Sequence, residues 1–293
     1  MTAQSPIVVG VDGSSAAMHA VRWAAVDAAR QGAELLLVNV VTTADMYVPA
    51  MYSPPIDVQG TEHAARELLI AASVIAQEEA GPVRHVAVST RVIRGPVGPA
   101  LLGLSKDARM IVVGSRGMGA FGRGLLGSVS STLPRHAHCP VAVVHAPPDD
   151  AVRAPKGRVV VGVDGSPNSV PAIEIAFGEA SRRGADLVAV HAWSDTNEPY
   201  SYRIAWPDIE ASEEALLAEC LAGWAERYPD VSVRRIVVPD SATKRIFEES
   251  ERADLVVVGS HGRGGFAGMT LGSTSQALLH SVHCPIIIAR SDV

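Results

Sequence analysis

The 293-residue chain is predicted to be an α/β protein made of two tandem, doubly wound domains, each with a five-stranded parallel sheet. Residues 7–41 match residues 159–193 without a gap, and residues 110–146 match residues 255–290, so one domain occurs twice. In each half, short apolar runs without polar alternation alternate with segments of helical pattern. This alternation favours parallel strands joined by right-handed crossovers.

The expected elements of the first half follow from these runs, and the second half repeats their order. The expected strands are residues 7–11, 34–41, 85–93, 110–114 and 141–145. The expected helices are residues 16–31, 61–79, 97–106 and 129–136. Gly32 follows the first helix and Gly184 takes its place in the second half, which suits a left-handed helix end.

The domain limits are expected at residues 1–147 and 155–293. The residues around this junction are polar and contain three prolines, Pro147, Pro148 and Pro155, which is typical of an interdomain linker. The length also fits two domains at about 100–200 residues each.

Composition excludes several protein classes. Hydrophobic residues make up 47% and charged residues 19%, as in a folded soluble protein. The net charge of −6 argues against nucleic-acid binding. No segment approaches the roughly 18 apolar residues of a membrane helix, and no secretion signal is apparent. The three cysteines are far apart, which predicts reduced thiols in the cytoplasm, with Cys220 buried in a helix.

A glycine-rich pattern, G-x2-G-x9-G-S, follows the expected fourth strand of each half. It is formed by Gly114, Gly117, Gly127 and Ser128, and again by Gly259, Gly262, Gly272 and Ser273. Glycine allows backbone N–H groups to approach a ligand, and the final Gly-Ser opens a helix whose N-terminus attracts anions. The pattern therefore favours a phosphate site. The simpler alternative is a tight turn and a helix capped by the serine.

Two other glycine motifs are weaker hypotheses. Gly117, Gly119 and Gly122 form a dinucleotide fingerprint, but it follows the fourth strand and lacks the acidic residue about 20 positions later. The second copy has Ala267 at the third glycine position. A Walker loop requires Gly-Lys, and the chain contains no Gly-Lys pair, which argues against conventional P-loop hydrolysis.

A histidine-cysteine cluster before the last strand resembles a metal site. It consists of His136, His138 and Cys139, but Ser281 replaces the first histidine in the second half. A turn before the strand is therefore the favoured interpretation.

An aspartate ends the first strand of each half, Asp12 and Asp164. In an open parallel sheet, ligands bind at the carboxyl ends of strands where the strand order reverses. If the first and fourth strands are neighbours there, Asp12 faces the glycine loop, where a carboxylate suits a ribose hydroxyl or phosphate-bound Mg²⁺. The alternative is a turn or cap aspartate, and both roles can coexist. Gly10 and Gly162 lie within the strand and permit close approach of a ligand.

These motifs resemble the ATP-binding branch of the universal stress protein family, and the repeat resembles its tandem actinobacterial members. The resemblance covers nearly the whole chain and rests on the glycine pattern after strand four and the acid after strand one. It implies a Rossmann-like sheet of order 3-2-1-4-5 in each half. It also implies one ATP site per domain, with Mg²⁺ as a candidate companion of the phosphates.

Position by position, the resemblance also implies the roles of individual residues. Asp12 and Asp164 would approach adenosine or ribose, and the backbone at Val40 and Ala192 would face adenine. The residues implied for ribose and phosphates are Gly114, Ser115, Arg116, Gly117, Met118, Gly119, Ala120, Gly127, Ser128 and Val129, and Gly259, Ser260, His261, Gly262, Arg263, Gly264, Gly265, Gly272, Ser273, Thr274 and Ser275.

The two sites are expected to differ at a few positions. Asp195 lies near the implied adenine side, where the first half has Thr43. Arg263 stands where the first half has Met118, and Arg263 or Arg123 would add positive charge near the phosphates.

The resemblance implies a cytoplasmic regulator of stress response and growth, in which ATP is a bound signal. No general base or nucleophile arrangement emerges from the sequence. The alternatives are a slow ATPase or nucleotidyl transferase on the same fold, and a scaffold that binds no nucleotide. The expected partners are a regulatory protein and a second copy in a homodimer, with the two halves pairing through their last strands because exposed sheet edges invite pairing.

Overall fold

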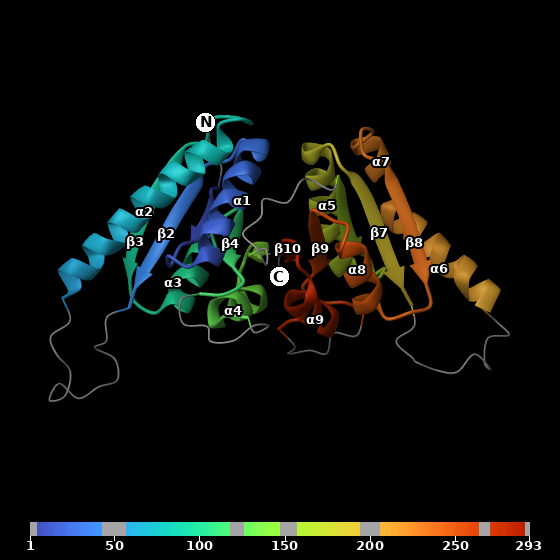
Figure 1. The fold of residues 1–293 in the computed structure, drawn as a ribbon. Helices are drawn as coiled ribbons and strands as arrows, with labels where there is room; N and C mark the ends of the chain where they lie inside the picture. The colour runs from blue at the N-terminus through green and yellow to red at the C-terminus, as the bar shows by residue number, and fades with distance from the viewer. Residues whose placement is uncertain are drawn as a thin grey trace, which may run out of the picture. The chain divides into compact units, whose positions relative to one another are not determined.

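The computed structural model describes residues 5–42, 57–117, 126–146, 157–193, 206–263 and 270–290. It divides into two compact units, Met1–Ala146 and Pro147–Val293, each a parallel sheet covered by helices (Figure 1). The predicted fold class is confirmed.

The first unit contains a five-stranded sheet in the order β3-β2-β1-β4-β5. Its strands are β1 (Ile7–Gly10), β2 (Leu35–Val41), β3 (Val88–Arg94), β4 (Met110–Gly114) and β5 (Val141–Val144). All the pairs are parallel, and Val8 lies between Leu36 of β2 and Ile111 of β4. From β1 the chain continues to β2 and β3 on one side of the sheet, and from β4 it continues to β5 on the other. The strand order therefore reverses between β1 and β4.

Four helices cover this sheet. They are α1 (Ser15–Gln31), α2 (Val58–Ala80), α3 (Val97–Leu104) and α4 (Ser128–His136). Helices α1 and α2 pack together, and so do α3 and α4. Helix α1 begins where the Ser14 hydroxyl accepts a hydrogen bond from the Ala17 N–H, and it ends at Gly32 with a φ of 63°. Helix α2 begins earlier than predicted because the Asp57 carboxylate caps it by accepting from the Gly60 N–H.

The second unit repeats the plan in the order β8-β7-β6-β9-β10. Its strands are β6 (Arg158–Gly162), β7 (Asp186–Ala192), β8 (Val233–Val238), β9 (Leu255–Gly259) and β10 (Ile286–Ala289). Its helices are α5 (Val170–Arg183), α6 (Trp206–Leu221), α7 (Trp224–Arg227), α8 (Ala242–Ser250) and α9 (Ser273–Ser281). A 3-10 turn, η2 (Pro167–Ser169), precedes α5, and Gly184 ends α5 with a φ of 60°.

The core is aliphatic along the central strands, but the edge strands are less buried, and the expected burial of Cys220 is wrong. Strands β3 and β8 lie at sheet edges and expose several of their residues, including Arg91 and Arg234, so not every strand is buried on both faces. Cys220 is only half-buried, because its position on α6 leaves it partly open to solvent, whereas Cys139 and Cys284 are buried. Burial raises the pKa of the Cys220 thiol.

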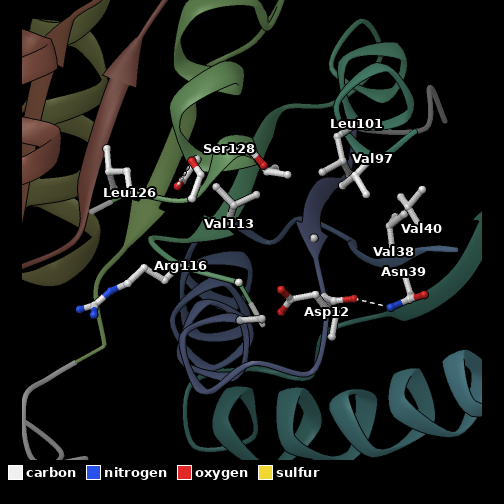
Figure 2. Close-up of a pocket in the computed structure, with 18 residues that line it drawn as sticks. Asp12, Val38, Asn39, Val40, Val97, Leu101, Val113, Arg116, Leu126 and Ser128 are labelled. Atoms are coloured by element: carbon white, nitrogen blue, oxygen red, sulfur yellow. Dashed lines mark hydrogen bonds between the residues drawn. The ribbon is translucent and has the colours of Figure 1, made fainter. Parts of the chain in front are cut away.

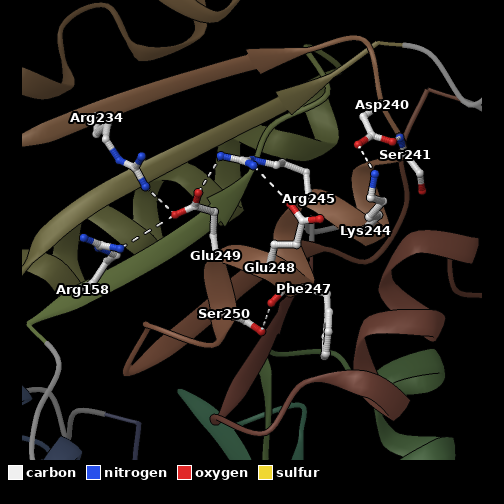
Figure 3. A network of polar contacts seen from close by, with 10 residues as sticks. All are labelled: Arg158, Arg234, Asp240, Ser241, Lys244, Arg245, Phe247, Glu248, Glu249 and Ser250. Atoms are coloured by element: carbon white, nitrogen blue, oxygen red, sulfur yellow. Dashed lines mark hydrogen bonds and ion pairs between the residues drawn. The ribbon is translucent and has the colours of Figure 1, made fainter.

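A charge network holds α8 against its sheet (Figure 3). The nearly buried Glu249 accepts hydrogen bonds from Arg245, at 2.8 Å, and from Arg234 of β8, and Arg158 of β6 lies 3.8 Å away. At the repeat offset, Glu249 corresponds to Leu104 of α3, an apolar residue. The same helix position therefore carries an ion-paired residue in the second unit and an apolar residue in the first.

Among the described residues, no helix is both long and apolar enough to cross a membrane.

Gly114→Ala tests how closely β4 approaches α1. A Cβ atom on Gly114 would lie 2.5 Å from the carbonyl carbon of Ala16, which is backbone and cannot turn away. The variant should lose about 1–3 kcal/mol of unfolding free energy, measured by urea denaturation. Gly103→Ala is the matched control: no atom lies within 4 Å of its Cβ position. It should gain up to about 1 kcal/mol because alanine favours the helix. Equal stability of Gly114→Ala and the unaltered protein would contradict this contact.

Candidate functional site

The first unit has a cavity of about 540 Å³ where its strand order reverses (Figure 2). The carboxyl ends of β1, β2 and β4 form its floor, and α3 and the start of α4 complete its wall. Four of its apolar side chains, Val38, Val40, Val97 and Leu101, lie together on the side away from Arg116, whereas Val113 and Leu126 lie nearer Ser128. The cavity therefore has an apolar end and a polar end, with Asp12 between them.

Asp12 joins the end of β1 to the glycine loop after β4. Its Oδ1 accepts hydrogen bonds from the Ser14 N–H, at 3.0 Å, and the Ser14 hydroxyl, at 2.6 Å. A Cβ atom on Gly117 would lie 2.5 Å from the other carboxylate oxygen, Oδ2. A side chain at Gly117 would therefore force the Asp12 carboxylate to shift. Asp12 therefore forms the expected turn and also lines the cavity, and its expected role toward a ligand stays a prediction.

The polar end of the cavity is the N-terminus of α4. Gly127 is the N-cap, in an extended conformation with a φ of −70°, and no side chain caps this helix. The expectation that Ser128 and Ser273 cap their helices is wrong: each is the first helical residue, after Gly127 and Gly272. The physical reason is that the Gly127 N–H bonds the Ser115 carbonyl, which fixes the glycine as the entry to the helix. Uncapped first-turn N–H groups attract an anion.

Apart from Val40, the sequence did not single out the apolar residues at that end of the cavity, and it did not single out Asn39. The Asn39 side chain lines the cavity and donates a hydrogen bond of 2.7 Å to the Val11 carbonyl, next to Asp12. The ends of β2 and the start of α3 meet at the same sheet edge as Asp12, so the rule for parallel strand ends could have indicated them.

The second unit has an equivalent but smaller cavity of about 300 Å³. Ile246 of α8 narrows it, because a Cβ atom on Gly162 would lie 2.8 Å from the Ile246 Cδ1. In the first unit, Leu101 is 3.4 Å from the equivalent point on Gly10. Ser169, Trp193 and Ile246 are lining residues that the sequence did not indicate.

The Asp164 carboxylate is more heavily bonded than a simple turn requires. Its Oδ1 accepts from the Ser166 N–H, the Ser166 hydroxyl and the Ser169 hydroxyl, and its Oδ2 accepts from the Arg263 N–H at 2.6 Å. Burial alone would raise the pKa of Asp164, but these hydrogen bonds together hold it below the usual value.

The structure brings most of the predicted site residues to these two cavities. The first cavity is lined by Gly10, Asp12, Val40, Gly114, Arg116, Gly117, Gly127, Ser128 and Val129. The second is lined by Gly162, Asp164, Ala192, Gly259, His261, Gly262, Arg263, Gly272, Ser273, Thr274 and Ser275.

The remaining predicted residues lie elsewhere. Ser115 and Ser260 are buried beneath the loops and do not line the cavities, because their N–H groups bond Val144 and Ala289 of the neighbouring strands. Arg116 does line the first cavity, but its guanidinium points away from Asp12 (Figure 2). The predicted residues outside the described ranges are Met118, Gly119, Ala120, Arg123, Asp195, Gly264 and Gly265.

In the described part of the chain, no group of three or more His, Cys, Asp or Glu side chains is arranged to hold a metal. The His138 N–H instead donates to the Ser105 hydroxyl at 3.0 Å, and Cys139 is buried, which is typical of a turn before β5.

Known proteins resemble this chain in both sequence and fold. The model of the Universal stress protein family matches residues 5–145 and 156–290. The chain is 46% identical over 292 residues to universal stress protein Rv2005c of Mycobacterium tuberculosis, covering 98% of the chain and 97% of the relative. It is 42% identical over 287 residues to universal stress protein Rv2623 of the same species, covering 98% and 97%. A universal stress protein from Archaeoglobus fulgidus has a similar fold, with a TM-score of 0.70 at 21% identity, covering 99% of this chain and 97% of that one.

Asp164→Asn tests the ionised state of Asp164. Its folded-state pKa lies below the usual 3.8, so the ionised group stabilises the fold above that pH, and the stabilisation disappears as the pH falls through the lower, folded-state pKa. At pH 7 the variant should lose about 1–3 kcal/mol of unfolding free energy, because an amide keeps one acceptor oxygen and cannot serve the donors on both sides of the group. The difference should shrink toward zero in acid, measured by urea denaturation across pH. Asp186→Asn, at an exposed residue of β7, is the control and should change little. A difference that does not vary with pH would contradict this account.

Proposed function

Because the chain belongs to the universal stress protein family, in its tandem two-domain form, we propose that it binds ATP at one site in each domain and acts as a nucleotide-dependent regulator of stress response and growth. The proposal rests on one observation: Asp12 and the uncapped N-terminus of α4 line the same cavity.

Each part of ATP has a matching surface in the first cavity. The apolar end, with the backbone of Val40, suits the flat apolar faces of adenine, and a volume of about 540 Å³ is that of a small-molecule pocket. The Asp12 carboxylate can accept hydrogen bonds from ribose hydroxyls. The N–H groups of Ser128 and Val129, at the uncapped start of α4, suit a phosphate. If Mg²⁺ accompanies the phosphates, Asp12 is the lining group with the matching chemistry.

The lining residues favour a bound signal over a substrate. Among the described residues of the first cavity, Asp12 is the sole carboxylate, and its Oδ1 already accepts two hydrogen bonds from Ser14. No histidine lines that cavity in the described part, and the chain has no Gly-Lys pair. A bound nucleotide would therefore meet groups that hold it, without a group placed to activate water.

Cys139, Cys220 and Cys284 are reduced thiols, which supports a cytoplasmic location as part of the same proposal. The output would be an interaction with a regulatory protein, together with pairing of the two halves and formation of a homodimer.

Ser128→Asp tests the phosphate site without removing the helix. A carboxylate in the first turn favours a helix N-terminus, so the fold should persist, but it repels a phosphate. Titration calorimetry with ATP should show two sites per chain in the unaltered protein, one in Ser128→Asp or Ser273→Asp, and none in the double variant. Ser128→Ala is the control, because it keeps the backbone donors and should retain two sites. Full binding by the double variant would contradict the proposed phosphate site.

The enzyme alternative is tested with labelled ATP. The purified protein should give less than about one turnover per minute, far below the usual enzyme range. Sustained turnover that is lost in Asp12→Ala and Asp164→Ala would replace the binding function with an ATPase or a transferase. Absence of ATP uptake, with no adenine nucleotide in native mass spectra, would support the scaffold alternative.

A further inference from the structure

An acid-base pair, His191 and Glu213, lies beside the lining residues of the second cavity, at a position where the first unit has the neutral Asn39. His191 takes the place of Asn39 and also bonds the residue before the aspartate, with its Nδ1 2.7 Å from the Val163 carbonyl. A carbonyl only accepts, so Nδ1 carries a proton. The other ring nitrogen, Nε2, lies 2.7 Å from the Glu213 Oε2, which requires a shared proton between the ring and the carboxylate. The second unit thus places an acidic residue of α6 beside its cavity.

The same Glu213 oxygen also faces Arg263 of the glycine loop. The Arg263 Nη2 is 3.7 Å from it, while the Arg263 N–H bonds Asp164. The guanidinium lies over Gly165, because a Cβ atom there would be 2.6 Å from Nη2. Arg263 is therefore held on the α6 side of the cavity mouth. In the first half the corresponding residue, Met118, carries no charge.

The floor of the second cavity is also more constrained. Ser169 adds a hydrogen bond to Asp164 where the first unit has Ala17. Ile246 narrows the space beside Gly162, on a helix that the Glu249 network holds against its sheet (Figure 3). These contacts agree with the smaller volume, about 300 Å³ against about 540 Å³.

We propose that the second, smaller site binds adenosine phosphates more weakly than the first, and that Glu213 lowers its affinity further by competing with the phosphates for Arg263. This inference rests on the proposed function. Phosphates arriving at the start of α9 carry negative charge toward Glu213, and Arg263 must leave Glu213 to bind them. The first site fills at low ATP concentration, and the second fills only at higher concentration, so the chain responds to ATP over two concentration ranges.

Calorimetry on single-site variants measures each affinity separately. Ser273→Asp reports the first site and Ser128→Asp reports the second. The first site should bind ATP about tenfold more tightly, a difference of ~1.4 kcal/mol. Glu213→Gln, made in the Ser128→Asp background, should tighten ATP binding about threefold to tenfold, the range expected for removing one partly exposed charge. In the Ser273→Asp background it should have no effect.

The matched control and a second ligand separate competition from a structural role. Glu214→Gln removes a charge from the next, exposed position of α6 and should leave both affinities unchanged. Adenosine has no phosphates, so its affinity for the second site should not respond to Glu213→Gln. Arg263→Met, which keeps the His191–Glu213 pair, should weaken ATP binding at the second site and leave adenosine binding unaltered.

The outcomes distinguish this inference from the proposed function. Equal affinities at the two sites, or a Glu213→Gln effect that is the same for ATP and adenosine, would overturn the inference while ATP binding stands. Unchanged or weaker ATP binding in a folded Glu213→Gln variant would also overturn it. If neither the unaltered protein nor either single-site variant binds ATP, the proposed function itself is contradicted.

Discussion

The close passage of the glycine loop over the strand-one aspartate is the constraint on which both sites depend. In the first unit, Gly117 leaves no room for a side chain beside the Asp12 carboxylate, and Gly262 has the same relation to Asp164. This contact is possible because β1 pairs with β4, and β6 with β9, which brings residues about 100 positions apart to one sheet edge. The loop then leads directly into the uncapped N-terminus of α4 or α9. One backbone arrangement therefore places a carboxylate and a set of N–H donors on opposite sides of a cavity.

The repeat preserves this backbone arrangement and varies the side chains around it. In the first unit, apolar residues and an asparagine leave a larger cavity. The lining of the second cavity instead includes Ile246, Ser169 and Arg263. Charged groups also hold α6 and α8 in place. The uncapped helix starts are common to both units because they belong to the backbone. The two cavities differ in their side chains, since those can change without disturbing the sheet.

Much of the candidate site could be predicted from the sequence, because the glycine and aspartate positions serve the backbone. Gly114, Gly117 and Asp12 are recognisable from spacing alone, and the structure places them at one cavity. Asn39 and Glu213 were not recognisable, because neither belongs to a motif and each acts through a residue distant in sequence. The role expected of Ser128 as a cap was wrong because the hydrogen bond from Gly127 to Ser115, which moves the helix entry back by one residue, depends on the folded loop.

The sequence by itself determined the repeat, the alternation of strands and helices, and the glycine pattern, since each is a local property of backbone conformation or apolar periodicity. The left-handed helix ends at Gly32 and Gly184 belong to the same class. Only the tertiary structure decided which strands lie at the sheet edges, how large each cavity is, and which charged groups meet beside it. The pairing of Glu213 with His191 and Arg263 joins a helix, a strand and a loop, and such contacts depend on how separate elements pack.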